Sequence, residues 1–182
     1  MTLKNKFFIA LGLIAFAVAG RFVPHLWNLT PVAAVALLSG ARLGFGWGIA
    51  VPLSVMAITD PILGLTGLPM MLTIYLAFIL PGVIGYFARN SSSTAFVLGG
   101  SFASTIFFYL STNAAVWMFT SMYPHNLAGL IASYVAGLPF VMNQIVGDLF
   151  FTAALFTIWE FGKVFAVRMK TNKMSLSGEK VF

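Results

Sequence analysis

Residues 94–119 read TAFVLGGSFASTIFFYLSTNAAVWMF, a stretch of hydrophobic and small residues without a charged side chain. The absence of charge extends to both sides, because residues 90–147 contain no Asp, Glu, Lys or Arg. A helix needs about 20 apolar residues to cross a bilayer core, so this region has room for two crossings. The whole chain is 60% hydrophobic and 8% charged, with a mean hydropathy of +0.97. These values are typical of an all-α membrane protein.

Six hydrophobic segments are separated by polar or irregular breaks and predict six transmembrane helices. They cover Phe7–Gly20, Pro31–Ala41, Phe45–Thr59, Pro69–Ala88, Thr94–Phe119 and Leu138–Ala166. The second and third segments are shorter than a straight span requires, which leaves their boundaries open. We expect a single six-helix transmembrane domain over residues 1–167, followed by a basic cytoplasmic tail over residues 168–182.

The basic residues predict how these helices are oriented. Positively charged residues favour the cytoplasmic side of a membrane. With six crossings, Arg21 alone among the 10 Lys and Arg residues falls on the side opposite to both termini. We therefore predict a multi-pass protein of the inner membrane with cytoplasmic termini. Its outward segments are then residues 21–30, 60–68 and 120–137.

The first segment has two interpretations. Lys4 and Lys6, the apolar core that follows, and the small residues Ala17 to Ala19 are also typical of a cleaved signal peptide. We predict a retained helix, because the charge bias works with this segment as the first span. Cleavage is the alternative.

The last segment contains three polar residues that a bilayer core disfavours, Asn143, Gln144 and Asp148. An ionised carboxylate near the midplane costs roughly 2.5–3.5 kcal/mol on insertion scales. We therefore expect Asp148 to face a partner, a wet cavity or a ligand, or else to be protonated. Gln144 lies one helical turn before Asp148 and shares its face of the helix.

The fifth segment carries a polar or amphipathic residue at every fourth position, namely Ser101, Thr105, Tyr109, Asn113 and Trp117. This stripe winds around the helix because four residues exceed one 3.6-residue turn, so only neighbouring members face one point. Matched depths predict Asn113 opposite Asn143, and Tyr109 opposite Asp148, around a polar chamber that opens outward. The alternative is that these side chains only bond one helix to the other.

Two histidines and several aromatic residues lie in the outward segments. His25 and His125 are interpreted first as interfacial loop residues, and two histidines without carboxylates predict no metal site. Trp27 and Trp117 are interpreted first as part of an aromatic belt at the membrane surface, with stacking on a ligand as the alternative. No cofactor is predicted.

Asp60 ends the third segment and precedes a proline, which disfavours helix at Asp60 itself. We therefore predict a solvated turn residue. A pair with Arg21, or contact with a ligand, is the alternative.

Small residues recur on the first segment at helical spacing. Ala15 and Ala19 form one pair, and Gly12 begins a second row. Such faces let membrane helices approach closely, so we predict a docking face for another helix of this chain or of a partner.

The sequence excludes several kinds of chemistry. The chain has no cysteine, which excludes disulfides and thiolate sites. It lacks the phosphate-loop, HExxH and GxSxG motifs, and we predict that it is not an enzyme. The basic residues form no stripe interleaved with aromatics, so nucleic acid is not a predicted partner.

Two stretches carry a resemblance to a known family. They are PHLWNLTPVAAVALLSGARLGFGWG (24–48) and LPFVMNQIVGDLFFTAALF (138–156). The chain resembles a family of bacterial membrane proteins related to the substrate-capture (S) components of energy-coupling-factor transporters. The resemblance implies six helices, cytoplasmic termini, and a ligand pocket near the outer face. It also implies that Ala15 and Ala19 dock on a transmembrane coupling protein driven by ATPases.

The resulting hypothesis is a membrane component that binds and takes up a small vitamin-like molecule. The residues expected to bind it are His25, Trp27, Asn28, Tyr109, Asn113, Trp117, Asn143, Gln144 and Asp148. One alternative is a non-transporting scaffold that docks through the first helix. Another is a solitary vitamin transporter; related cobalamin-binding components use a cysteine as cobalt ligand, which His25 or His125 would have to replace here.

Overall fold

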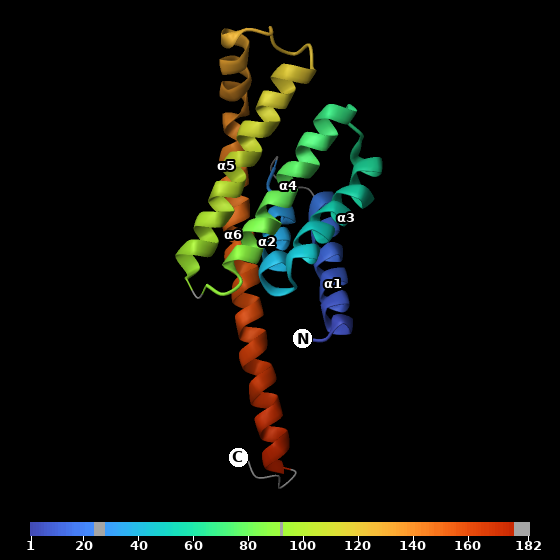
Figure 1. The fold of residues 1–182 in the computed structure, drawn as a ribbon, viewed down its shortest axis with the longest axis vertical. Coiled ribbons are helices and arrows are strands. Elements are labelled where there is room, and N and C mark those ends of the chain that lie inside the picture. The colour runs from blue at the N-terminus through green and yellow to red at the C-terminus, as the bar shows by residue number, and fades with distance from the viewer. Residues whose placement is uncertain (24–27, 92, 177–182) are drawn as a thin grey trace.

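A computed structural model of the protein describes residues 1–23, 28–91 and 93–176. In these residues six helices follow one another: α1 (Leu3–Phe22), α2 (Val32–Arg42), α3 (Phe45–Leu63), α4 (Leu68–Ala88), α5 (Thr94–Phe119) and α6 (Leu127–Leu176). The predicted all-α class is confirmed. Successive helices run up and down the bundle, and the start of α1 and the end of α6 lie at the same end (Figure 1). We call this end the lower end and the opposite end the upper end.

Five of these helices are long and apolar enough to cross a membrane, and α2 is not. α2 has 11 residues, which at about 1.5 Å per residue is roughly half of a hydrocarbon core of ~30 Å. Every residue from Val32 to Ala41 is buried, so other helices surround α2. The prediction of six transmembrane helices is thus corrected to five long helices and one short buried helix. α2 still returns the chain toward the lower end (Figure 1).

Glycine brings the backbones of α2, α3 and α4 into direct contact. A Cβ atom on Gly40 of α2 would lie 1.9 Å from the carbonyl oxygen of Gly82 in α4. A Cβ atom on Gly82 would lie 2.0 Å from the carbonyl oxygen of Gly48 in α3. Only glycine fits such an approach, and small residues favour it inside membranes because close packing drives helix association there. The contact between α2 and α4 is accordingly the most extensive in the bundle.

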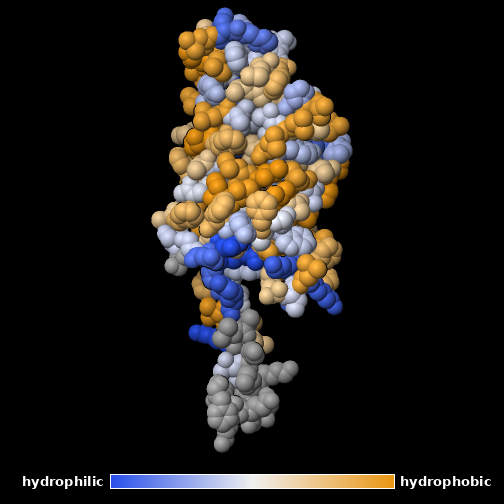
Figure 2. All heavy atoms as spheres, viewed as in Figure 1, coloured by the Kyte–Doolittle hydropathy of each residue, from blue (hydrophilic) through white to orange (hydrophobic). Residues whose placement is uncertain are grey.

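The outer surface of the bundle is hydrophobic between polar ends. Phe8, Leu76 and Phe102 are 60%, 64% and 45% exposed, respectively. Figure 2 shows a broad hydrophobic zone, with hydrophilic residues gathered below it. Exposed apolar surface on this scale marks contact with lipid. The chain is therefore a multi-pass membrane protein.

α6 differs most from its predicted boundaries. It begins at Leu127 rather than Leu138, because the Asn126 side chain accepts a 2.9 Å hydrogen bond from the backbone N–H of Gly129 at the start of the helix. Pro139 lies inside α6 without ending it. The connection predicted over 120–137 is thus a shorter non-helical segment, residues 120–126. At the other end, α6 continues through residues 168–176 of the predicted tail.

Candidate functional site

Asp148 lies inside α6 with 2% of its surface exposed. Its Oδ2 accepts a 2.6 Å hydrogen bond from the hydroxyl group of Thr105 on α5. Gln144, one helical turn earlier on the same face of α6, is 5% exposed and lies beside the same carboxyl group. A carboxyl group that leaves water without such partners is strongly disfavoured. The structure thus supplies the partners that the sequence requires for Asp148.

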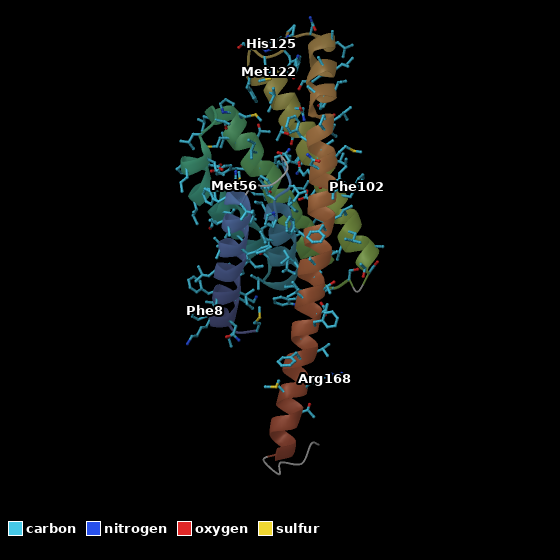
Figure 3. All side chains as sticks on the ribbon, turned by 180° about the vertical axis from the view of Figure 1, so that it is seen from behind. Phe8, Met56, Phe102, Met122, His125 and Arg168 are labelled. Atoms are coloured by element: carbon cyan, nitrogen blue, oxygen red, sulfur yellow. The ribbon has the colours of Figure 1, made fainter. Side chains whose placement is uncertain are left out.

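Asp148 and Gln144 line a cavity of about 410 Å³ that lies beneath the connection between α3 and α4. All six helices contribute to its wall, through Arg21, Val32, Met56, Met71, Phe108 and Gln144 in chain order. Met56, labelled in Figure 3, marks the side formed by α3. The rings of Phe78 and Phe108, 4.9 Å apart between centroids, provide an aromatic part of the wall. We call this space the Asp148 cavity.

An ion pair forms another part of the wall. The Nη1 atom of Arg21 on α1 lies 2.9 Å from Oδ1 of Asp60 on α3, with side chains that are 18% and 12% exposed. Nη1 also lies 2.7 Å from the sulfur of Met56. Asp60 is helical, because α3 continues to Leu63 despite Pro61. The prediction of a solvated turn residue is therefore wrong, and the alternative, a pair with Arg21, is what the structure shows.

The N-terminal end of α2 opens onto the Asp148 cavity. Thr30 and Val32 line the cavity, and α2 begins at Val32 without a side-chain cap. The unpaired N–H groups at a helix start carry partial positive charge. A short helix that starts inside a membrane bundle thus directs this charge into the cavity, as discontinuous helices do at transporter sites.

A smaller cavity of about 130 Å³ adjoins the first one. The two share Asn28, Phe108 and Gln144 in their walls. Tyr109 and Asn113 of α5 line this second space, which we call the Asn113 cavity. Asn28 adopts a left-handed backbone conformation with φ of 62°, which asparagine tolerates better than most residues. The Asn113 cavity is therefore lined by Asn28, Tyr109, Asn113 and Gln144, and, unlike the predicted polar chamber, by neither Asn143 nor Asp148.

Hydrogen bonds connect α5 to α6 along most of their shared length. The Tyr109 hydroxyl donates to the carbonyl oxygen of Tyr134 at 2.6 Å, and the Ser133 hydroxyl donates to that of Asn113 at 2.8 Å. Deeper in the bundle, the hydroxyls of Ser101 and Thr152 are 3.1 Å apart. Ser101, Thr105 and Tyr109 of the polar stripe therefore bond α5 to α6, as the alternative predicted. Tyr109 and Asn113 also line a cavity.

The register between α5 and α6 differs from the predicted one. Thr105, not Tyr109, contacts Asp148. Asn113 lies beside Gly137, where a Cβ atom would come within 2.6 Å of its Oδ1, and not opposite Asn143. The difference is about one helical turn or more, and its cause is the early start of α6. Depth counted from Leu138 placed every later residue of the helix too close to the upper end.

The other predicted ligand-binding residues lie apart from these cavities or are not described. Asn143 is half-buried and lines neither the Asp148 nor the Asn113 cavity. Trp117 donates from Nε1 to the carbonyl oxygen of Pro124 at 3.0 Å and contacts the ring of His125. Figure 3 shows His125 at the top of the α5–α6 pair. His25 and Trp27 lie outside the described residues.

Sequence reasoning missed Thr105, Arg21 and Asp60 as site residues. Thr105 belongs to the polar stripe, but the predicted depths paired Tyr109, one turn closer to the upper end, with Asp148. Arg21 and Asp60 are far apart in the chain, and their pairing was only the alternative to a solvated turn at Asp60, with no local pattern to favour it. Among the described residues, no group of three or more His, Asp or Glu side chains could hold a metal ion.

The predicted docking residues lie on the outside of α1. Gly12, Ala15 and Ala19 are exposed, and a Cβ atom on Gly12 would meet nothing within 4 Å. Ala10 and Ala17, on the opposite face, are buried in the core of the bundle. The small-residue face is therefore not used for packing within the described part of this chain.

Comparison with known protein families gives a match over most of the chain. A model described as a family of unknown function (DUF6580) matches residues 1–170, which includes both stretches that carried the resemblance. No curated protein and no solved structure matches the chain. Since the matched region contains α1 to α5 and all of α6 that lines the cavities, the chain belongs to this family of unknown function, DUF6580.

Proposed function

We propose that this protein is the substrate-binding (S) component of an energy-coupling-factor-type transporter and that the Asp148 cavity binds the small vitamin-like molecule to be taken up. The observation that carries the proposal is a cavity of about 410 Å³ inside a membrane bundle, lined by Asp148, Gln144 and the Arg21–Asp60 pair. Sites for small molecules have volumes of a few hundred Å³ and few, well-placed polar groups. Ionisable groups at membrane depth are costly and mark ligand pathways.

The wall of the cavity favours a particular ligand chemistry. Asp148 and Gln144 offer hydrogen-bond acceptors on one side, whereas Arg21 and the start of α2 offer positive charge and donors on another. Phe78 and Phe108 present ring surface between them. These groups suit a compact molecule that has an aromatic or other planar ring, an N–H or O–H donor at one end and an acceptor or anionic group at the other.

Orientation and docking complete the proposal. With the basic lower end in the cytoplasm, the Asp148 cavity lies toward the outside, where a ligand arrives. The exposed face of Gly12, Ala15 and Ala19 then offers a surface on which a transmembrane coupling protein, driven by ATPases, packs. His125, the described histidine proposed to replace a cobalt-binding cysteine, lines neither cavity, which disfavours cobalamin as the ligand.

Ligand binding tests the proposal directly. Native mass spectrometry of the mildly extracted chain should show a co-purifying small molecule, and equilibrium dialysis should then give a saturable affinity. Gln144→Ala should raise Kd by about 10-fold or more, because a buried polar contact is lost. Asn143→Ala is the matched control and should leave Kd unchanged, since this neighbouring amide lines neither cavity. Equal effects of both substitutions would contradict the assignment of the cavity.

A second candidate function is a non-transporting scaffold, favoured by the uncovered small-residue face of α1. The two functions respond oppositely to mutation. For a scaffold, Ala15→Leu abolishes the capture of the partner and the cellular phenotype, while Asp148→Asn leaves the phenotype unchanged. For the proposed S component, Asp148→Asn removes uptake, while Ala15→Leu removes uptake but leaves binding by the purified chain intact.

A further inference from the structure

A second polar cavity lies at the lower end of the bundle, between the α4–α5 connection and α6. Its volume is about 660 Å³. The residues that matter for its chemistry are Arg42, Arg89, Lys163, Ser91, Ser93 and Thr94. We call it the Arg89 cavity. It shares no wall residue with the Asp148 cavity, so the proposed function does not account for it.

Positive charge exceeds negative charge in the Arg89 cavity. Among the residues that the structure describes, Glu160 alone supplies a carboxylate to this cavity. Two cations share this group: Nη2 of Arg42 lies 2.8 Å from Oε1, and Lys163 pairs with Oε2. Arg89 stacks on the ring of Tyr86, with its Cζ atom 4.0 Å from the ring centroid, and has no acidic partner among the described residues. One carboxylate cannot compensate three cations, so the cavity attracts an anion.

Hydrogen-bond donors gather at the same place. The Nε atom of Arg42 is buried and lacks a hydrogen-bond partner within the described chain, a situation that costs about as much as a lost hydrogen bond. The hydroxyls of Ser91, Ser93 and Thr94 border the cavity where α5 begins. The start of α5 adds the partial positive charge of a helix N-terminus. Arginine forks, hydroxyls and a helix start together are the groups that bind phosphate.

The position of the cavity relates it to the membrane surface. The hydrophilic residues at the lower end lie directly below the hydrophobic zone of the bundle (Figure 2). Val97, Leu98 and Phe161 form an apolar side of the same cavity, and Phe161 is 70% exposed. A phosphate group with an attached hydrocarbon chain would therefore find polar partners and apolar surface next to each other.

We propose that the Arg89 cavity is a binding site for a phosphate group, held by Arg42, Arg89 and Lys163 with the hydroxyls at the start of α5. Basic pockets on the cytoplasmic side of membrane bundles bind the head groups of anionic lipids. A soluble phosphate compound would present the same chemistry to the cavity. The two sources differ in whether the acyl chain contributes to binding.

Titration of lipid and phosphate onto the purified, delipidated full chain tests the site. Native mass spectrometry should show phosphatidylglycerol binding about 10-fold more tightly than zwitterionic phosphatidylcholine. The double variant Arg89→Gln, Lys163→Gln should lose about 10-fold or more in affinity, because each cation near a lipid head group contributes measurably. Arg168→Gln is the matched control, since this exposed arginine lies on the part of α6 that extends beyond the other helices (Figure 3).

The outcomes separate the possibilities. Unchanged lipid affinity in the double variant, or an equal loss in Arg168→Gln, would overturn the proposal. The site accepts soluble phosphates if millimolar inorganic phosphate displaces the lipid and, in the absence of lipid, raises the melting temperature of the chain. If phosphate does neither, the site is specific for lipid. Thermal unfolding of each single variant checks that the bundle is intact. Gln144→Ala should leave phosphatidylglycerol binding unchanged, so failure here and failure of the proposed ligand site are distinguishable.

Discussion

Thr105 and Asp148 face each other across the α5–α6 interface, with the hydroxyl oxygen of one 2.6 Å from Oδ2 of the other. Both are almost completely buried, at 1% and 2% exposure. The pair therefore joins two tasks: it holds the last two helices in register, and it orients a carboxyl group at the wall of the Asp148 cavity. The stability of the bundle and the geometry of the candidate site depend on the same hydrogen bond.

Replacing Thr105 by valine tests this relationship. The substitution keeps the shape of the side chain and removes its hydroxyl, which leaves a buried carboxyl oxygen without its donor. We expect a loss of about 1–3 kcal/mol in the free energy of unfolding, measured by denaturant titration in detergent. Thr73→Val is the control, because Thr73 is half-buried and its hydroxyl bonds only within α4, to the carbonyl oxygen of Pro69. Equal losses in the two variants would show that the α5–α6 bond contributes nothing.

Glycine substitution tests the close packing of α4 against α3. Gly82→Ala places a Cβ atom 2.0 Å from the backbone of Gly48, so the α3–α4 contact has to open. Overpacking of this kind costs about 1–3 kcal/mol or more, and we expect a clear drop in melting temperature. Gly99→Ala on α5 is the control, since its Cβ atom meets nothing within 4 Å. A stable Gly82→Ala variant would contradict the close approach of these helices.

Cross-linking tests the register of α5 and α6. The chain contains no cysteine, so any disulfide that forms must join the two introduced cysteines. Ser101→Cys with Thr152→Cys should form a disulfide on mild oxidation, because the two native hydroxyls are 3.1 Å apart. Ser101→Cys with Ala153→Cys should not, since the neighbouring position points about 100° away around the helix. Reversal of this result would show a different register.

Labelling of single cysteines tests the orientation in the membrane. His125→Cys, in the connection between α5 and α6, should react with a membrane-impermeant maleimide added to intact cells. Arg168→Cys, near the lower end of α6, should react only after the cells are opened. The expectation follows from the basic residues at the lower end. The opposite labelling pattern would invert the proposed topology.

Local patterns in the sequence predicted much of this architecture. Charge-free hydrophobic segments identified α1, α4 and α5 within a few residues, because lipid contact imposes a composition that is visible along the chain. The cost of a carboxyl group in hydrocarbon identified Asp148 as a residue that requires partners. The start of α6 was misplaced, because the Gly137 to Pro139 stretch looks like a helix break in sequence, whereas the helix continues through it with Leu138 and Pro139 exposed.

The sequence by itself determined that this is a multi-pass helical membrane protein with a buried carboxyl group in its last helix, since both follow from the free energy of placing each residue type in hydrocarbon. Only the tertiary structure decided that α2 is a short buried helix, that Thr105 is the partner of Asp148, and that Arg21 pairs with Asp60. These depend on how closely three glycine-containing backbones approach and on the register between helices. Both are properties of contacts between distant segments, and no local pattern records them.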